Sequence, residues 1–143
     1  MGLVTRASDT FTRADSTTTL GTAETGGAWT AHVGTWGISS NQAYCPTSAG
    51  LNIATVDTGY SDGFVTVTVT GVSAAGQRLV FRLSDSSNYW DLQAVTGSCL
   101  LQKYVAGSLT NVVNLGTTIS SGDVLRVTTE DTRRMLAQVS HSH

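Results

Sequence analysis

Residues 77–113 read QRLVFRLSDSSNYWDLQAVTGSCLLQKYVAGSLTNVV, and this stretch decides the fold. The dipeptides Thr96-Gly97 and Ala106-Gly107 are typical of two-residue hairpin loops, and the serine-rich segment Ser84–Ser87 suits a third hairpin. Runs rich in aromatic, leucine and valine side chains flank each turn. The sequence therefore predicts a meander of four antiparallel strands, Gln77–Leu83, Asn88–Val95, Cys99–Val105 and Leu109–Val113.

The three turns also predict which residues face each other, because a hairpin loop sets the register of the strands that it joins. Side chains alternate between the two faces of a sheet, so a register assigns every residue to one face. One face then gathers large apolar side chains, and we expect this face to turn toward the core. The predicted cross-strand pairs are Leu83–Asn88, Phe81–Trp90, Leu79–Leu92, Leu92–Leu101 and Leu101–Val112.

The opposite face of the predicted meander carries polar and tyrosine side chains. Sugar hydroxyls bind planar polar groups, and the C–H faces of sugars stack on aromatic rings, so this face suits a glycan. An ordinary solvated or protein-covered sheet face is the alternative interpretation. The candidate residues of this face are Arg78, Arg82, Tyr89, Asp91, Gln93, Gln102, Tyr104 and Asn111.

The rest of the chain also predicts strands. Residues Phe64–Thr70 alternate valine with threonine, the period-2 pattern of a half-buried strand, and similar runs lie at Leu51–Val56 and Val124–Thr129. No segment shows apolar residues at the spacing of a core-facing helix over three turns. Many short strands separated by glycine- and serine-rich turns indicate an antiparallel sandwich or barrel.

The composition limits the class of protein. A length of 143 residues fits a single domain, 1–143. The net charge is −2 and Lys103 is the only lysine, so we expect neither a phosphate-binding basic patch nor nucleic acid as a partner. No apolar run approaches the length of a membrane span, and no N-terminal signal-peptide pattern is present, so we expect no membrane partner.

The acidic and histidine residues do not predict catalysis. Glycoside hydrolysis needs two carboxylates at a set separation, whereas Glu24 and Glu130 are the only glutamates and the aspartates lie mostly in turns. Turn aspartates such as Asp85 and Asp123 usually cap their own backbone. His32 is the only histidine outside the tail, and no serine lies in a nucleophile-elbow pattern. We therefore expect a protein that is not an enzyme.

Metal and disulfide chemistry is only weakly indicated. His141 and His143 would share a face of an extended tail, which gives two ligands at most. We expect no cofactor, with calcium held by turn carboxylates as the alternative, at Asp57, Asp62 or Asp85. Cys45 and Cys99 are the only cysteines and form no CxxC motif, so they are either free thiols or one disulfide.

Several short strings, in this order and spacing, resemble the laminin-G-like, concanavalin A-like lectin/glucanase domains of actinobacterial secreted proteins and of actinobacteriophage virion proteins. The resemblance covers about residues 8–129. The strings are Asp9-Thr10-Phe11-Thr12-Arg13-Ala14-Asp15, Leu20-Gly21, Gly27-Ala28-Trp29, Gly34-Thr35-Trp36-Gly37-Ile38, Leu79–Asp85, Asn88-Tyr89-Trp90, Leu101–Tyr104 and Gly122–Val127.

The resemblance implies an all-β, antiparallel two-sheet jelly-roll sandwich whose concave face binds ligand in lectin-type members. Residues 1–8 would form an N-terminal arm. Such domains usually continue with further strands after the one at Val124–Thr129, whereas residues 130–143 form an atypical tail. We therefore expect one or two strands to be missing, with a neighbouring chain completing the sheet. A short helix in the tail is the alternative.

Together these observations predict a non-enzymatic virion protein of a bacteriophage, located at the virion surface. A capsid decoration protein, a head fibre or a tail accessory subunit would each fit, with other virion proteins or copies of the same chain as partners. The alternative is an extracellular carbohydrate-binding module that recognises host or environmental glycans through the polar sheet face.

Overall fold

A computed structural model describes residues 4–46, 50–60, 62–70, 76–130 and 134–141. These residues form antiparallel β-strands joined by turns and loops, and no helix occurs among them. The chain divides into two compact units, residues 1–59 and residues 60–143, which we call the N-terminal and the C-terminal unit. No helix in the described part of the chain is long and apolar enough to span a membrane.

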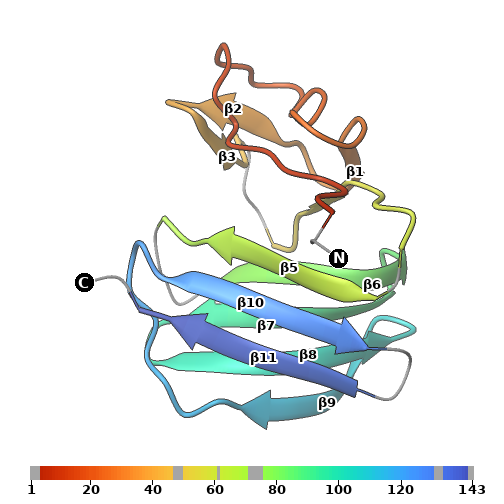
Figure 1. Ribbon diagram of the computed structural model, residues 1–143, viewed down its shortest axis with the longest axis vertical. Coiled ribbons are helices and arrows are strands. Elements are labelled where there is room, and N and C mark those ends of the chain that lie inside the picture. The colour runs from red at the N-terminus through yellow and green to blue at the C-terminus, as the bar shows by residue number, and fades with distance from the viewer. Residues whose placement is uncertain (1–3, 47–49, 61, 71–75, 131–133, 142–143) are drawn as a thin grey trace. The chain divides into compact units, whose positions relative to one another are not determined.

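The N-terminal unit contains two small sheets (Figure 1). The first pairs β1 (Thr30–Val33) with β4 (Ile53–Thr55), and the second pairs β2 (Gly37–Ser39) with β3 (Gln42–Tyr44). Long loops connect these short strands, and isolated bridges such as Ser16–Ile38 tie the loops to them. The buried apolar side chains of this unit are Leu20, Ala23, Ile38 and Ile53.

The C-terminal unit contains a four-stranded and a three-stranded antiparallel sheet, which lie one behind the other in Figure 1. The four-stranded sheet has the order β6-β7-β8-β9, formed by Gln77–Asp85, Asn88–Val95, Ser98–Val105 and Ser108–Asn114. The three-stranded sheet has the order β11-β10-β5, formed by Arg134–Ser140, Val124–Glu130 and Gly63–Thr68. This arrangement is consistent with a β-sandwich.

Apolar side chains from both sheets form the core of the C-terminal unit. Leu92 of β7 and Leu125 and Val127 of β10 are fully buried there, and Met135 and Val139 of β11 pack against the core. Because side chains alternate along a strand, each sheet contributes one face to this core. The core residues are Val69, Leu79, Phe81, Leu92, Ala94, Cys99, Ile119, Leu125 and Val127.

The predicted strands of the meander are present, and most of the predicted register is confirmed. Phe81 pairs with Trp90, and Leu92 pairs with both Leu79 and Leu101. The two-residue loops at Thr96-Gly97 and Ala106-Gly107 are confirmed by the flanking pairs, Val95–Ser98 and Val105–Ser108.

Two predicted pairs are wrong, because β-bulges shift the register. A bulge between Phe81 and Asp85 makes Asp85, and not Leu83, the partner of Asn88. A second irregularity at Lys103/Tyr104 makes Val113, and not Val112, the partner of Leu101. A bulge inserts extra residues into one strand, so the strand beyond it slips relative to its neighbour.

The expectation for the end of the chain is also wrong in part. Residues Arg134–Ser140 form β11, which pairs along its whole length with β10. No helix occurs within residues 134–141, β10 has a partner strand on each side, and Glu130 is the last residue of β10. The apolar residues Met135, Ala137 and Val139 alternate and pack against the core, which explains why this segment forms a strand.

Candidate functional site

Most residues of the predicted polar face lie on one face of the four-stranded sheet, opposite the face that packs into the core. Cross-strand pairs bring Arg78 beside Gln93, Asp91 beside Gln102, and Tyr89 beside Tyr104. The register and the strict alternation of side chains along β7 and β8 therefore unite six of the eight predicted residues.

The other two predicted residues lie at irregular positions of the sheet. Arg82 lies in the bulge of β6, in the left-handed region with a φ of 51°. Asn111 pairs with Lys103, one position away from the predicted register, and its side chain is outside the described residues.

The side chain of Arg78, on β6, contacts residues of both β7 and β8 on this face. Its Nη1 atom donates hydrogen bonds to Asp91 Oδ2 at 2.9 Å and to the Tyr104 hydroxyl at 3.2 Å. Its guanidinium carbon lies 5.6 Å from the centre of the Tyr104 ring, which in turn stacks on Tyr89 at 4.9 Å. Arg78, Tyr89, Asp91 and Tyr104 therefore form one connected group, which we call the sheet-face cluster.

The centre of the predicted glycan surface is buried. Asp91 has no exposed surface, Tyr89 is 3% exposed, and Gln93 and Gln102 are 7% and 4% exposed. Burial raises the pKa of Asp91 to about 6, against the opposing effect of Arg78. Asp91 Oδ1 and Gln102 Oε1 have no hydrogen-bond donor within the described part of the chain. These four side chains are closed to a ligand in this structure. A ligand could contact only side chains at the edge of this face.

An open pocket of about 160 Å³ lies at the hairpin end of the sheet-face cluster, and we call it the hairpin pocket. Asn88 is fixed there because its side chain donates to Asp85 Oδ1 at 2.9 Å and accepts a hydrogen bond from the Ala106 backbone at 2.9 Å. Tyrosine rings and cationic side chains line the same space, a combination suited to a small polar ligand. Its lining residues are Arg82, Ser84, Asn88, Tyr89, Trp90, Lys103, Tyr104 and Val105.

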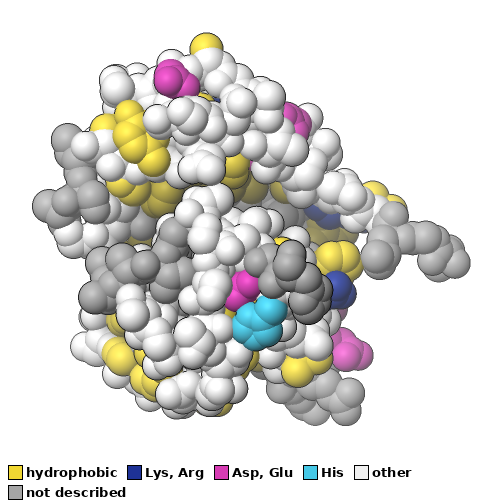
Figure 2. Space-filling model, turned by 90° about the vertical axis from the view of Figure 1, so that its left-hand side faces the viewer, with side chains coloured by type: hydrophobic (Ala, Val, Ile, Leu, Met, Phe, Trp, Pro, Cys, Tyr) yellow, Lys and Arg dark blue, Asp and Glu magenta, His cyan; other side chains and the backbone are white. Residues whose placement is uncertain are grey.

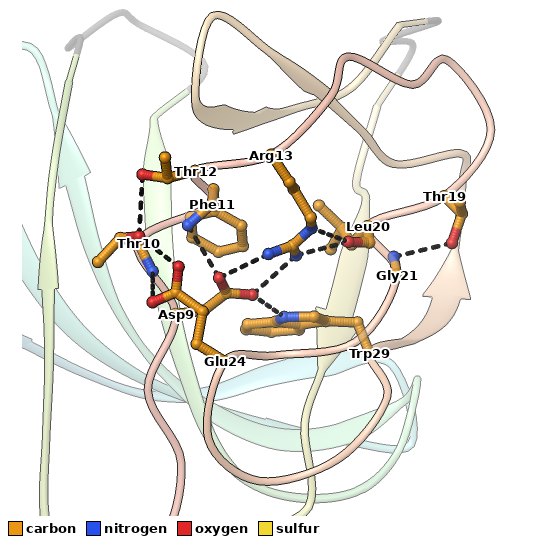
Figure 3. Close-up of polar contacts among 10 residues, drawn as sticks. All are labelled: Asp9, Thr10, Phe11, Thr12, Arg13, Thr19, Leu20, Gly21, Glu24 and Trp29. Carbon is orange, nitrogen blue, oxygen red and sulfur yellow. Dashed lines mark hydrogen bonds and ion pairs between the residues drawn. The ribbon is translucent and has the colours of Figure 1, made fainter.

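A second polar group, which sequence analysis did not predict as a contact network, lies in the N-terminal unit (Figure 3). Asp9 is its centre and accepts hydrogen bonds from both terminal nitrogens of Arg13 at 2.8 Å and from Trp29 Nε1 at 2.7 Å. Arg13 also donates through Nε to the Leu20 backbone oxygen at 2.9 Å. We call Asp9, Arg13, Leu20 and Trp29 the Asp9 cluster.

The Asp9 cluster holds its carboxylate in the ionised form. Burial raises the pKa of Asp9, but the hydrogen bonds from Arg13, Trp29 and the Phe11 backbone outweigh burial, and the net result is a lowered pKa. Phe11 stacks on Trp29 with ring centres 5.6 Å apart. The spacing of Asp9, Arg13 and Trp29 was visible in the sequence, but it indicated only a family resemblance and not which residues bind each other.

Three residues near the end of the chain form a hydrogen-bonded series. His141 Nδ1 lies 2.8 Å from Asp123 Oδ2, and His141 Nε2 lies 3.0 Å from Thr117 Oγ1. Asp123 is 1% exposed and also accepts a hydrogen bond from the Ser120 backbone at 2.9 Å. The order carboxylate, imidazole, hydroxyl is that of a catalytic triad. The two hydrogen bonds connect His141, which follows β11 directly, to residues of the segment Thr117–Asp123.

Two of the predicted turn carboxylates, Asp57 and Asp85, cap their own turns. Asp57 accepts a hydrogen bond from the Gly59 backbone and Asp85 accepts one from the Ser87 backbone, both at 2.8 Å. Within the described ranges, no group of three or more His, Cys, Asp or Glu residues is arranged to hold a metal ion. Cys45 and Cys99 are free thiols, and burial raises the pKa of Cys99 to about 11.

Comparisons of the chain with family models, with curated proteins and with solved structures gave no match.

Proposed function

We propose that this protein is a non-enzymatic structural subunit of a larger assembly, a bacteriophage virion protein with a concanavalin A-like jelly-roll fold. The resemblance of the sequence supports the virion assignment. The exposed strand β9 supports association with other copies of the chain, and it is the observation on which this proposal depends.

Strand β9 forms an edge of the four-stranded sheet and carries large apolar side chains on its surface. Leu109, Val112 and Val113 are 46%, 47% and 51% exposed. The segment Ser108–Asn114 contains no charged residue. An exposed, uncharged edge strand presents free backbone groups to a further strand, which is how sheets extend between chains.

The opposite edge of the same sheet is protected. Strand β6 carries Arg78, Arg82 and Asp85, and its bulge interrupts the regular backbone pattern. Charges and bulges are the usual means by which proteins prevent edge-to-edge pairing. In this sheet the β6 edge is therefore protected against pairing with another strand, whereas the β9 edge is open to it.

The surface of the molecule agrees with a role in packing. Most described atoms on the face drawn in Figure 2 are white, the colour of uncharged polar side chains and backbone, with scattered yellow apolar side chains and a few charged ones. Charged residues make up 13% of the sequence, about half of the average for soluble domains. Such a surface can be covered by a neighbouring subunit with little cost for removing charges from water.

Sedimentation velocity over a range of protein concentrations tests this proposal. We expect the wild-type chain to associate as its concentration rises, and Val112→Lys to remain monomeric because a lysine on the open edge opposes pairing. Ser121→Lys places the same charge in an exposed turn outside the strands and serves as the matched control, expected to associate like the wild type. Monomeric wild-type protein at the highest concentration, with no co-purification in virus particles, would contradict the proposal.

A second candidate function is glycan binding at the hairpin pocket. The observation in its favour is the combination of Arg82, Lys103 and Tyr104 around one open space, with the Tyr104 ring stacked on the buried Tyr89. A glycan array tests it, with the loss of all signals expected for Tyr104→Ala and for Arg82→Ala. A signal that both variants retain would exclude this pocket as the binding site.

A further inference from the structure

The pairing of β9 with β8 determines which backbone groups of β9 face outward at the edge of the sheet (Figure 1). Along an antiparallel strand, successive residues direct their N–H and C=O groups alternately to the two sides. The Leu115 nitrogen, directly after β9, donates to the Cys99 oxygen of β8 at 2.9 Å. Val113 therefore also directs its backbone groups to β8, whereas Val112 and Asn114 direct theirs away from the sheet.

The irregularity of β9 limits the regular part of this edge. The register skips Thr110 between Lys103 and Tyr104, so no residue of β8 opposes Thr110. Its hydroxyl instead donates to the Lys103 backbone oxygen at 3.1 Å. An extra residue bends its strand and disrupts the ladder locally. The stretch after Thr110 continues as a regular ladder, and its outward backbone groups belong to Val112 and Asn114.

The side chains of this edge suit pairing with an identical strand. Like charges placed opposite each other destabilise a sheet, and the segment Ser108–Asn114 carries no charge that two copies would bring together. Val112 and Val113 lie on opposite faces and are 47% and 51% exposed, so each face offers an apolar contact. The Asn114 side chain accepts a hydrogen bond from the Gly116 backbone at 2.8 Å, which fixes the end of the strand.

We propose that two copies of the chain pair antiparallel through β9, with a two-fold axis at Val113. Val112 of each copy then exchanges both backbone hydrogen bonds with Asn114 of the other copy, and the two Val113 side chains meet at the axis. An axis at Val112 would instead place Asn114 opposite the bulged Thr110, where the ladder is distorted. This inference rests on the proposed function, because it specifies the contact through which the copies associate.

The same geometry limits how far the sheet extends. The paired sheet has the order β6-β7-β8-β9-β9-β8-β7-β6, so that β6 forms both of its outer edges. The charges and the bulge of β6 oppose further pairing. A two-fold contact uses the same surface on both subunits and closes on itself. Association through this sheet therefore stops at two copies.

Disulfide cross-linking of single-cysteine variants measures the register. Directly opposed, non-hydrogen-bonded residues have Cα atoms about 4.5 Å apart and diagonal neighbours about 7–8 Å, whereas a disulfide needs less than about 7 Å. We use the full-length chain with Cys45→Ser, because Cys99 is buried and Cys45 is not fully so. With oxidised glutathione, Val113→Cys is expected to form the covalent dimer at least roughly ten times faster than Val112→Cys, followed by non-reducing electrophoresis.

Two controls separate edge pairing from random collision. Ser121→Cys places a thiol in an exposed turn outside the strands and gives the collisional rate. Adding Val112→Lys to Val113→Cys introduces a charge on the edge, so we expect cross-linking to fall to the rate of Ser121→Cys. Circular dichroism of each variant before oxidation shows that the sheets are intact.

Three results would overturn the inference, and they differ in what they imply for the proposed function. Faster cross-linking of Val112→Cys than of Val113→Cys would show another register, and association through β9 would stand. Equal rates for Val113→Cys and Ser121→Cys, in a chain that associates in sedimentation velocity, would show that the copies meet through another surface. A chain that stays monomeric at every concentration would contradict the proposed function as well.

Discussion

Asp91 has no exposed surface. One oxygen of its carboxyl group accepts a hydrogen bond from Arg78, and the other has no donor in the described part of the chain. Its pKa is raised from 3.8 to about 6 by burial. Because the folded-state pKa lies above the unfolded value, this residue favours folding most below pH 4. That contribution to the free energy of unfolding is lost as the pH rises through about 6.

Replacing Asp91 by asparagine tests this argument. The asparagine side chain keeps an acceptor for Arg78 and supplies an amide that can donate to the unpartnered Gln102 oxygen. We expect Asp91→Asn to raise the free energy of unfolding at pH 7 by roughly 1–3 kcal/mol and to flatten its decline between pH 4 and pH 7. Urea titrations at several pH values measure this, with the exposed Glu130→Gln as the control. An unchanged pH profile would refute the argument.

Ala106 offers a second residue-scale prediction. It has a φ of 51° and is followed by Gly107 with a φ of 81°, the left-handed pair of a type I′ hairpin turn. An alanine is strained in this region, whereas asparagine adopts it readily. We expect Ala106→Asn to raise the free energy of unfolding by about 0.5–1 kcal/mol, and Ala106→Val to lower it. A lower urea midpoint for Ala106→Asn would show that the turn is not of this type.

At the scale of elements, the hairpin turns could be predicted and the bulges could not. A two-residue loop needs a residue of positive φ, so Gly97 and Gly107 mark their turns in the sequence. The bulge in β6 contains Arg82 at a positive φ, and an arginine gives no signal of that conformation. Tyr89 and Tyr104 lie next to a regular two-strand ladder, and their shared face was predicted correctly. The partner of Leu101 on β9 lies beyond the second irregularity and was predicted wrongly.

Strand β11 was not predicted from the sequence for a different reason. The alternation of Met135, Ala137 and Val139 is typical of a strand, but the family that the sequence resembles has other residues there, so the resemblance predicted an atypical tail. The burial of Asp91, Gln93 and Gln102 had no signal in the local pattern either, because burial depends on what covers a strand and not on its own alternation.

Gly37 of β2 tests how the loops of the N-terminal unit are tied to its strands. A Cβ atom at this position would lie 2.1 Å from the backbone oxygen of Ser16, which accepts a hydrogen bond from the Ile38 backbone at 2.8 Å. We expect Gly37→Ala to lower the free energy of unfolding by about 1–3 kcal/mol, because the backbone oxygen cannot move away without losing this bond.

The matched control for this substitution is Gly27→Ala, since a Cβ at Gly27 meets nothing within 4 Å. Urea unfolding of both variants, followed by tryptophan fluorescence, makes the comparison. Equal midpoints for the two variants would show that the Ser16–Ile38 bridge does not hold this part of the chain.

At the scale of the whole molecule, the two units differ in how their strands are supported. The central strands β7, β8 and β10 each pair with two strands, whereas the strands of the N-terminal unit are three or four residues long and each pair with one strand. We expect the slowest amide hydrogen exchange in β7, β8 and β10 and faster exchange in β1–β4. Exchange in β2 and β3 as slow as in β10 would contradict this expectation.

The order of strands in the C-terminal unit also bears on how quickly the chain folds. Strands β6 to β9 each pair with the next strand along the chain, so hairpins alone assemble the four-stranded sheet. Strand β5 instead pairs with β10, and a hydrogen bond there joins Thr129 to Gly63, 66 positions away. Closing so long a loop lowers the conformational entropy of the chain before the contacts between the two strands form. We therefore expect the meander to form the nucleus of the folding transition state, with the pairing of β5 and β10 following after the rate-limiting step.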